Sequence, residues 1–99
     1  MSLYVINVLA SRDLSEIADY FAETNVEVGE RFFKEFNSKC QQLVSFPRSG
    51  KSYGAIRPDL RGLSLEGYII FYPILDDGIE ILRVVSGRRN LPSLFSDPN

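Results

Sequence analysis

Histidine is absent from this chain of 99 residues, and cysteine occurs once, at Cys40. A single cysteine cannot form an internal disulfide, and such sparse use of cysteine favours a reducing compartment. The usual zinc sites built from cysteine and histidine are therefore excluded, and no spacing of carboxylates indicates a site for a harder cation. The sequence predicts a protein with no metal and no other cofactor.

Long hydrophobic runs are also missing. No stretch is long and apolar enough to cross a bilayer, and residues 1–9 lack the basic start and cleavage site of a signal peptide. The 13 acidic and 11 basic residues nearly balance, so net charge does not mark the chain as a nucleic-acid binder. We expect one cytoplasmic domain over residues 1–99, with no membrane partner, that buries only about two-thirds of its unfolded surface.

A β-rich segment at residues 3–9 opens the chain, and a helical pattern follows it. Ser11 is a candidate N-cap, because its hydroxyl can accept a hydrogen bond from an amide of the first helical turn. Apolar side chains then recur at the i, i+3, i+4 and i+7 spacing of an amphipathic helix. They are Leu14, Ile17, Ala18 and Phe21.

A second helix is expected over about residues 26–44. Thr24-Asn25 separates it from the first, and Phe46-Pro47 stops it, because proline disfavours helix in the residue before it. The short joint predicts an antiparallel helical hairpin. The apolar face of this second helix consists of Phe32, Phe33, Phe36, Cys40 and Leu43.

A β-hairpin dominates the second half. Residues 67–75 and 79–85 are rich in β-branched and aromatic side chains, and Asp76-Asp77-Gly78 between them supplies a turn in which we expect Gly78 to take a positive φ. Both faces of the first run are apolar, which indicates that helices cover at least one side of it. Pro73 cannot donate to a ladder, so we expect a bulge or a missing hydrogen bond there.

A weaker strand candidate at residues 55–65 would extend the hairpin into a three-stranded antiparallel meander. The first strand should join an edge, and it would be antiparallel if it pairs with the run at 79–85. The predicted fold class is α+β, a two-layer β-α-α-β-β-β domain with the helical hairpin packed on a small, mainly antiparallel sheet.

Arginines in the second half are the candidate functional residues, because their planar forks suit phosphate or carboxylate partners. One alternative is that Arg83 simply pairs with Glu80 or Asp59 across the sheet. The remaining arginines could likewise be solvated or decorate an edge strand. The candidates are Arg57, Arg61, Arg83, Arg88 and Arg89.

Four segments of this half resemble the ParE branch of the RelE/ParE toxins of bacterial toxin–antitoxin pairs. They are RPDLR at 57–61, YIIFY at 68–72, DDG at 76–78 and IEILRVVSGRRNL at 79–91. The first half is similar too, with a strand, a short helix and a long helix rich in phenylalanine. The resemblance covers nearly the whole chain, and the hairpin motif is its most specific part.

The resemblance implies a toxin that forms a hetero-oligomer with a co-expressed, ParD-like antitoxin. ParE-like members act on DNA gyrase, whereas RelE-like members cut mRNA on the ribosome and carry a catalytic tyrosine or histidine beyond the last strand. The residues after Arg83 contain neither, and arginine stays protonated, which makes it a poor general acid. We therefore expect a gyrase inhibitor without catalytic residues, and a RelE-like ribosome-dependent endoribonuclease is the alternative. A third hypothesis is an inactive member that keeps only its antitoxin-binding surface.

The apolar surface of so small a domain predicts where a partner binds. Two short helices cannot cover both apolar faces of the hairpin strands, and exposed patches of this kind mark partner sites. We expect an antitoxin helix beside the helical hairpin and an extended antitoxin segment along the sheet. The expected antitoxin contacts are Leu14, Ile17, Phe21 and Tyr72, and the expected target contacts are the arginines.

Overall fold

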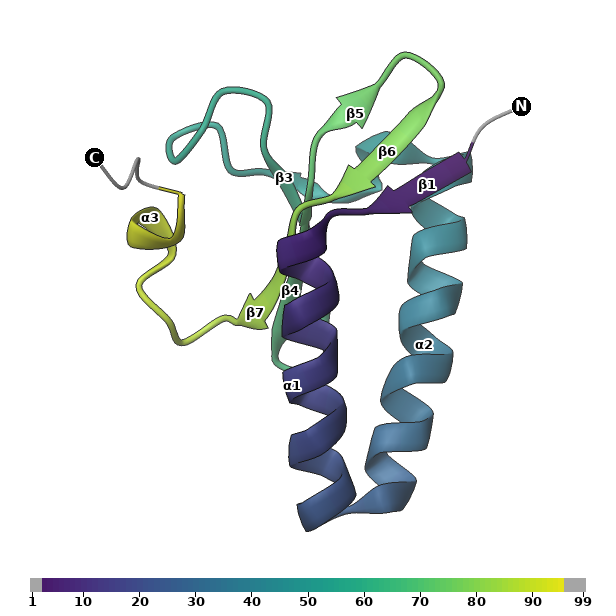
Figure 1. Ribbon diagram of the computed structural model, residues 1–99. Helices are drawn as coiled ribbons and strands as arrows, with labels where there is room; N and C mark the ends of the chain where they lie inside the picture. Colours follow the sequence, from purple (N-terminus) through teal and green to yellow (C-terminus); the bar gives the residue numbers. More distant parts are fainter. Residues whose placement is uncertain (1–2, 96–99) are drawn as a thin grey trace.

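An antiparallel helical hairpin is the largest feature of the computed structural model, which describes residues 3–95 (Figure 1). Helix α1 spans Val8–Thr24 and α2 spans Val26–Ser45. Asn25 is the only residue between them and caps both helices. Its backbone N–H donates to the Phe21 carbonyl at the end of α1, and its side-chain oxygen accepts from Val28 N at the start of α2. The predicted helical hairpin is therefore confirmed.

The first strand is shorter than expected and the first helix starts earlier. Strand β1 spans Leu3–Ile6, and the N-cap of α1 is Asn7, whose side-chain oxygen accepts from Leu9 N at 2.8 Å. The predicted N-cap Ser11 is wrong, since its amide already donates within the helix to the Asn7 carbonyl. Asparagine caps helices as well as serine does. The apolar residues Val8 and Leu9 in the first turn of α1 explain why the sequence pattern predicted a strand as far as residue 9.

The larger sheet is antiparallel, with strand order β2-β3-β4-β7. Its strands are Lys51–Ser52, Arg61–Leu65, Tyr68–Tyr72 and Arg83–Ser86. Strands β3 and β4 form a tight hairpin through Glu66 and Gly67, whose φ angles of 51° and 84° suit a type I′ turn. The predicted meander is confirmed, although residues 55–60 of the third strand candidate form a loop of turns instead.

The smaller sheet has the strand order β1-β6-β5, with β5 at Ile74–Leu75 and β6 at Gly78–Ile81. Strand β1 lies at its edge, as predicted, but it runs parallel to β6, so the expectation of antiparallel pairing is wrong. That expectation assumed that every connection reverses the chain. Figure 1 shows β1 crossing the ends of the helices, so the step from β1 into α1 is a corner rather than a reversal.

Gly78 is required by space rather than by backbone conformation. Among residues 3–95 only Glu66 and Gly67 have a positive φ, so the expected positive φ at Gly78 is wrong. A Cβ atom at Gly78 would overlap the carbonyl oxygen of Leu3 on the adjacent strand β1. Glycine at this position is therefore what allows β1 to pair closely with β6.

Both long runs of the predicted hairpin are broken where the chain passes between the sheets. Pro73 separates β4 from β5, as expected for a residue that cannot donate, and Leu82 separates β6 from β7. The Leu82 amide donates to the Phe71 carbonyl at 2.8 Å, while the register pairs Phe71 with Arg83. Two consecutive residues thus face Phe71, which is the arrangement of a β-bulge.

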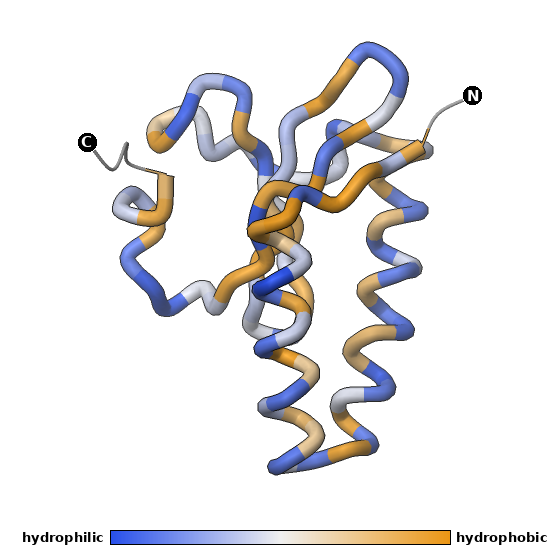
Figure 2. Tube along the Cα trace, viewed as in Figure 1, coloured by the Kyte–Doolittle hydropathy of each residue, from blue (hydrophilic) through white to orange (hydrophobic). Residues whose placement is uncertain are grey.

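The apolar core lies on both faces of the larger sheet, and Figure 2 shows hydrophobic residues meeting there. The helices cover one face, and the buried side chains between them include Phe32, Phe36, Cys40, Leu43, Ile70 and Tyr72. The other face carries Leu60, Ile69, Phe71 and Val85, covered by Tyr53, Ile56 and the C-terminal helix α3 at Leu91–Leu94. The α+β fold with a helical layer on the sheet is confirmed. No helix within residues 3–95 is long and apolar enough to cross a membrane.

Candidate functional site

An ion pair between Asp13 of α1 and Arg83 of β7 organises the basic end of the sheet. Arg83 Nε and Nη2 donate to the two carboxylate oxygens of Asp13 at 2.8 and 2.9 Å. The Val84 amide donates to the same buried carboxylate at 2.9 Å. The hydrogen bonds that Arg83 donates to Asp13 raise the pKa of its guanidinium, so this side chain stays charged at any physiological pH. Its partner is thus Asp13, and neither Glu80 nor Asp59.

The β-bulge at Leu82–Arg83 decides which way Arg83 lies. Ile79 and Ile81 both belong to the helix-facing core, and simple alternation would bury residue 83 beside them. The extra residue of the bulge puts Val84 in that core position instead. The side chain of Arg83 therefore leaves the strand on the face opposite the helices. Its guanidinium contacts Asp13 at the edge of β7, where the Val84 amide also points.

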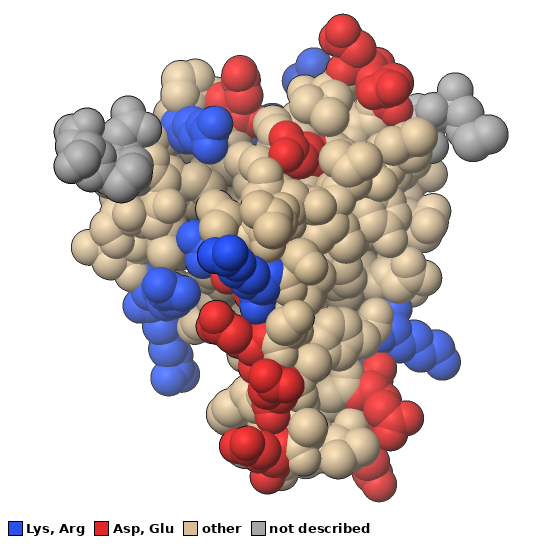
Figure 3. Space-filling view, viewed as in Figure 1, with Lys and Arg blue, Asp and Glu red and all other residues tan. Residues whose placement is uncertain are grey.

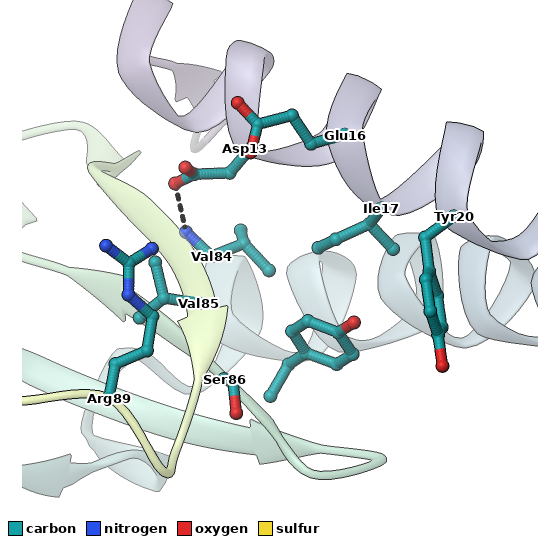
Figure 4. A pocket seen from close by; sticks show the side chains of 9 residues that line it. Asp13, Glu16, Ile17, Tyr20, Val84, Val85, Ser86 and Arg89 are labelled. Atoms are coloured by element: carbon teal, nitrogen blue, oxygen red, sulfur yellow. Dashed lines mark hydrogen bonds between the residues drawn. The ribbon is translucent and has the colours of Figure 1, made fainter.

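Two pockets lie on either side of this ion pair. Asp13 lines a pocket of about 260 Å³ between α1 and β7, and Arg83 lines a pocket of about 280 Å³ toward α3. Figure 4 shows the first pocket, with Glu16 and Tyr20 on the α1 side and Arg89 on the opposite side. Arg57 lines the second pocket beside Arg83. The fold therefore brings Arg57 beside Arg83 in one pocket and Arg89 to the adjacent pocket that Asp13 lines, and the Asp13–Arg83 ion pair joins the two.

The other two candidate arginines lie apart from these pockets. Arg61 is engaged with backbone, since its Nε and Nη2 donate to the Gly50 carbonyl at 3.1 and 2.7 Å and its Nη2 also donates to the Arg48 carbonyl. Arg88 is exposed on the turn after β7 and lines neither pocket. Within residues 3–95, no carboxylate pairs with Arg57, Arg88 or Arg89. Figure 3 shows basic groups over the upper part of this face and acidic groups along the lower part of α1.

The residues expected at the antitoxin interface lie mostly inside the protein. Tyr72 is fully buried; its hydroxyl donates to the Pro47 carbonyl at 2.6 Å and accepts from Gly50 N at 3.1 Å. Ile17 is buried, and Leu14 packs against the same core. Ile17 also lines the pocket between α1 and β7, and Phe21 lines a surface groove of about 310 Å³ at the joined ends of the helices. Direct contact with a partner is thus open to Phe21, whereas Tyr72 shapes the fold.

Sequence reasoning missed several apolar surface residues. The groove at Phe21 is completed by Ala18, Ala22, Val26, Gly29, Glu30 and Phe33. Ala18, Ala22 and Val26 recur at i, i+4 and i+8, a helical spacing that could have been read across the helix joint. Phe46 is 69 % exposed and lines a pocket of about 580 Å³ with Ile74, although the sequence showed it only as a helix stop.

Arginine supplies anion-binding groups at both pockets, and the first pocket also contains Glu16, Tyr20 and Tyr68. Burial raises the pKa of the Tyr68 phenol, and the nearby Tyr20 adds to this, so Tyr68 is a weaker acid than an exposed tyrosine and keeps its proton at neutral pH. Arginine does not release its proton under ordinary conditions. Within residues 3–95, no three acidic or cysteine side chains are grouped to hold a metal ion.

Known proteins share both the sequence pattern and the fold. Residues 4–91 match the family model described as the ParE toxin of the type II toxin–antitoxin system, parDE. Toxin ParE3 of Caulobacter vibrioides is 32% identical over 82 residues, which cover 82% of each chain. A solved structure described as the chromosomal ParDE TA system from P. aeruginosa has a TM-score of 0.72 at 20% identity, over 87% of this chain and 96% of that chain. At this identity the structural match speaks for the fold alone.

Proposed function

The chain belongs to the ParE toxin family of type II toxin–antitoxin systems, and we propose that it inhibits DNA gyrase and is neutralised by a cognate, ParD-like antitoxin. The family match includes the hairpin, the β-bulge and all five candidate arginines, since it extends from residue 4 to residue 91. Gyrase is the target that the ParE branch implies, and it acts in the cytoplasm, where we place the toxin.

The observation that carries this proposal is the gathering of Arg57, Arg83 and Arg89 in the two pockets beside the Asp13–Arg83 ion pair. Arg57, Arg83 and Arg89 outnumber Asp13 and Glu16, the two carboxylates that line the same pockets, so these pockets keep a net charge of +1 despite the slightly acidic chain. Planar guanidinium groups at the rims of two small pockets suit carboxylate or phosphate groups, both of which a gyrase–DNA complex presents. Arginine stays protonated and is a poor general acid or base, so a site built mainly on these three side chains favours inhibition by binding over RNA cleavage.

The apolar groove at the joined ends of α1 and α2 is our candidate seat for an antitoxin helix. Small residues at Ala18, Ala22 and Gly29 leave space there, and Phe21 and Phe33 supply apolar walls. An amphipathic helix can place apolar side chains into such a groove at i, i+3 and i+4 spacing. Of the expected contacts Leu14, Ile17 and Phe21, we therefore propose Phe21 as the one in the groove. Ile17 and Leu14 belong to the core under α1.

The test measures gyrase supercoiling and gyrase–DNA cleavage complexes in the presence of purified toxin. The toxin should block supercoiling, and the double variant Arg57→Ala/Arg89→Ala, which removes the two exposed arginines of the group, should inhibit at least about tenfold less while its unfolding free energy changes by under about 0.5 kcal/mol. A matched control, Lys34→Ala/Lys39→Ala, removes the same charge from α2 and should inhibit like the unaltered toxin.

Two results would contradict the proposal. Reproducible mRNA cleavage on translating ribosomes, with supercoiling unaffected, would assign the chain to RelE-like chemistry. Equal loss of inhibition in the arginine and lysine double variants would show that total charge matters and that the gathered arginines have no special role.

A further inference from the structure

The sheet edges of this protein are protected to very different degrees. An open edge presents unpaired N–H and C=O groups that can pair with another extended chain. Strand β7 is an edge, but α1 packs beside it. The outward-facing Val84 amide of β7 donates a hydrogen bond to the Asp13 carboxylate. Strands β2 and β5 are edges of two residues each, and Pro73 precedes β5. Strand β1, with four residues, is the longest edge without such a cover.

The backbone hydrogen bonds of β1 show which of its N–H and C=O groups pair with β6 and which point away from the smaller sheet. Leu3 N donates to the Asp77 carbonyl at 3.2 Å, and Asn7 N donates to the Ile81 carbonyl at 2.9 Å. Because backbone groups alternate along a strand, those of Leu3, Val5 and Asn7 face β6. The N–H and C=O groups of Tyr4 and Ile6 therefore point to the open side. The strand sequence LYVI contains no lysine, proline or other residue that normally blocks strand addition.

The side chains around β1 are apolar and exposed. Leu3 and Val5 are 47% and 46% exposed, and Leu75, which pairs with Gly78 on the same face, is 40% exposed. Gly78 pairs with Leu3 on one side and with Leu75 on the other, so these two apolar side chains flank it in the register. A chain that pairs with β1 would extend this apolar face and shield it from water.

Acidic residues border the same edge. Asp76 and Asp77 form the turn beside the start of β1, and Glu80 pairs in register with Val5. Figure 3 shows acidic groups at the top of the molecule, above the smaller sheet. None of these three forms an ion pair with a basic residue of the described chain. A complementary strand would thus carry apolar residues with lysine or arginine beside them.

We propose that the open edge of β1 binds an extended, apolar segment of the antitoxin that carries basic residues, and that this segment becomes the fourth strand of the smaller sheet. The inference rests on the proposed antitoxin partnership and specifies one edge for it. Tyr4 and Ile6 supply the backbone hydrogen bonds, Leu3 and Val5 supply the apolar contacts, and the Asp76-Asp77 turn attracts the basic residues.

The experiment uses the toxin and the purified product of the small reading frame next to its gene. Residue-resolved amide exchange is measured for the free toxin and for the complex. The amides of Tyr4 and Ile6 should exchange at least about tenfold more slowly in the complex, because each gains a strand partner, whereas Val5 is already paired with β6 and should change less.

Two substitutions at one position provide an independent readout. Ile6→Pro removes an N–H that points away from β6, so it should leave the sheet intact while weakening antitoxin binding by roughly tenfold or more. Ile6→Val keeps the N–H and should bind like the unaltered toxin. Thermal unfolding of both free variants checks that the fold is retained.

The outcomes separate this inference from the proposed function. If the complex forms but the exchange of Tyr4 and Ile6 is unchanged, the β1 edge is wrong and the antitoxin partnership stands. If no complex forms, the partnership and the inference both fall. Slowed exchange in concentrated free toxin, together with the mass of a dimer, would show that a second copy of this chain occupies the edge, and would overturn the proposed occupant.

Discussion

Removing the Asp13 carboxylate should destabilise the protein far more than an ordinary surface substitution. In Asp13→Ala the Arg83 guanidinium, whose side chain is only 17% exposed, loses its charge partner, and the Val84 amide loses its acceptor. Breaking a fully buried pair costs about 3–5 kcal/mol, and an orphaned buried amide costs about 1–3 kcal/mol. Because Arg83 can recover some hydration, we expect a total of about 3 kcal/mol.

That loss is large for a chain of this length. A domain of about 100 residues has about 5–15 kcal/mol of stability, and each kcal/mol shifts its Tm by roughly 4–8 °C. The Tm of Asp13→Ala should therefore fall by roughly 12–24 °C. Asp13→Asn is the matched control: its amide oxygen can still accept from Val84 N while its charge is lost, so we expect about half the effect.

Urea unfolding of the purified toxin at neutral pH measures these changes directly. A double-mutant cycle with Arg83→Ala isolates the coupling between the two side chains, which should be about 1.5–3 kcal/mol. A loss below about 1 kcal/mol in Asp13→Ala, or no coupling with Arg83, would refute the reasoning that this pair holds α1 to the edge of β7.

Three further outcomes follow from single contacts. Gly78→Ala should cost at least about 2 kcal/mol in urea unfolding, because its Cβ would overlap the Leu3 carbonyl oxygen, whereas Gly87→Ala, with ordinary contacts, should cost under about 1 kcal/mol. Tyr72→Phe removes a hydroxyl that serves two backbone groups before β2, and should lower stability by about 1–3 kcal/mol in the same assay; no change would mean that water replaces it. Burial raises the pKa of the Cys40 thiol to about 12, so native toxin should resist thiol reagents at pH 8. Because folding raises this pKa from its ordinary value of 9.0, the free energy of unfolding should be unaffected by the thiol below pH 9.0 and should fall as pH rises toward 12. Cys40→Ala should remove that dependence on pH.

Local patterns were sufficient wherever a single period or residue type decided the structure. The spacing of Phe32, Phe36, Cys40 and Leu43 predicts the buried face of α2, since helical geometry alone puts these residues on one side. Pro73 predicts the break between β4 and β5, because proline lacks the donor that a continuous ladder needs. The family resemblance likewise rests on residues that are near one another in the chain.

The candidate site depended on contacts between distant parts of the chain. Asp13 and Arg83 are 70 residues apart, and nothing in the residues around either one identifies the other as its partner. The bulge at Leu82 has no strong local signal, yet it shifts the alternation by one residue and so takes Arg83 out of the core. Sequence reasoning therefore found the arginine but not its environment.

The sequence by itself determined the α+β class, the helical hairpin, the β-meander and the family, because helical spacing, strand propensity and turn chemistry act over a few residues. Only the tertiary structure decided that β1 runs parallel to β6, that Tyr72 is a buried support, and which arginines share a region. These features depend on the direction in which the chain leaves β1 and on one extra residue between β6 and β7. Such choices are settled by the packing of the whole domain, where burying Ile79, Ile81 and Val84 outweighs continuous strand geometry.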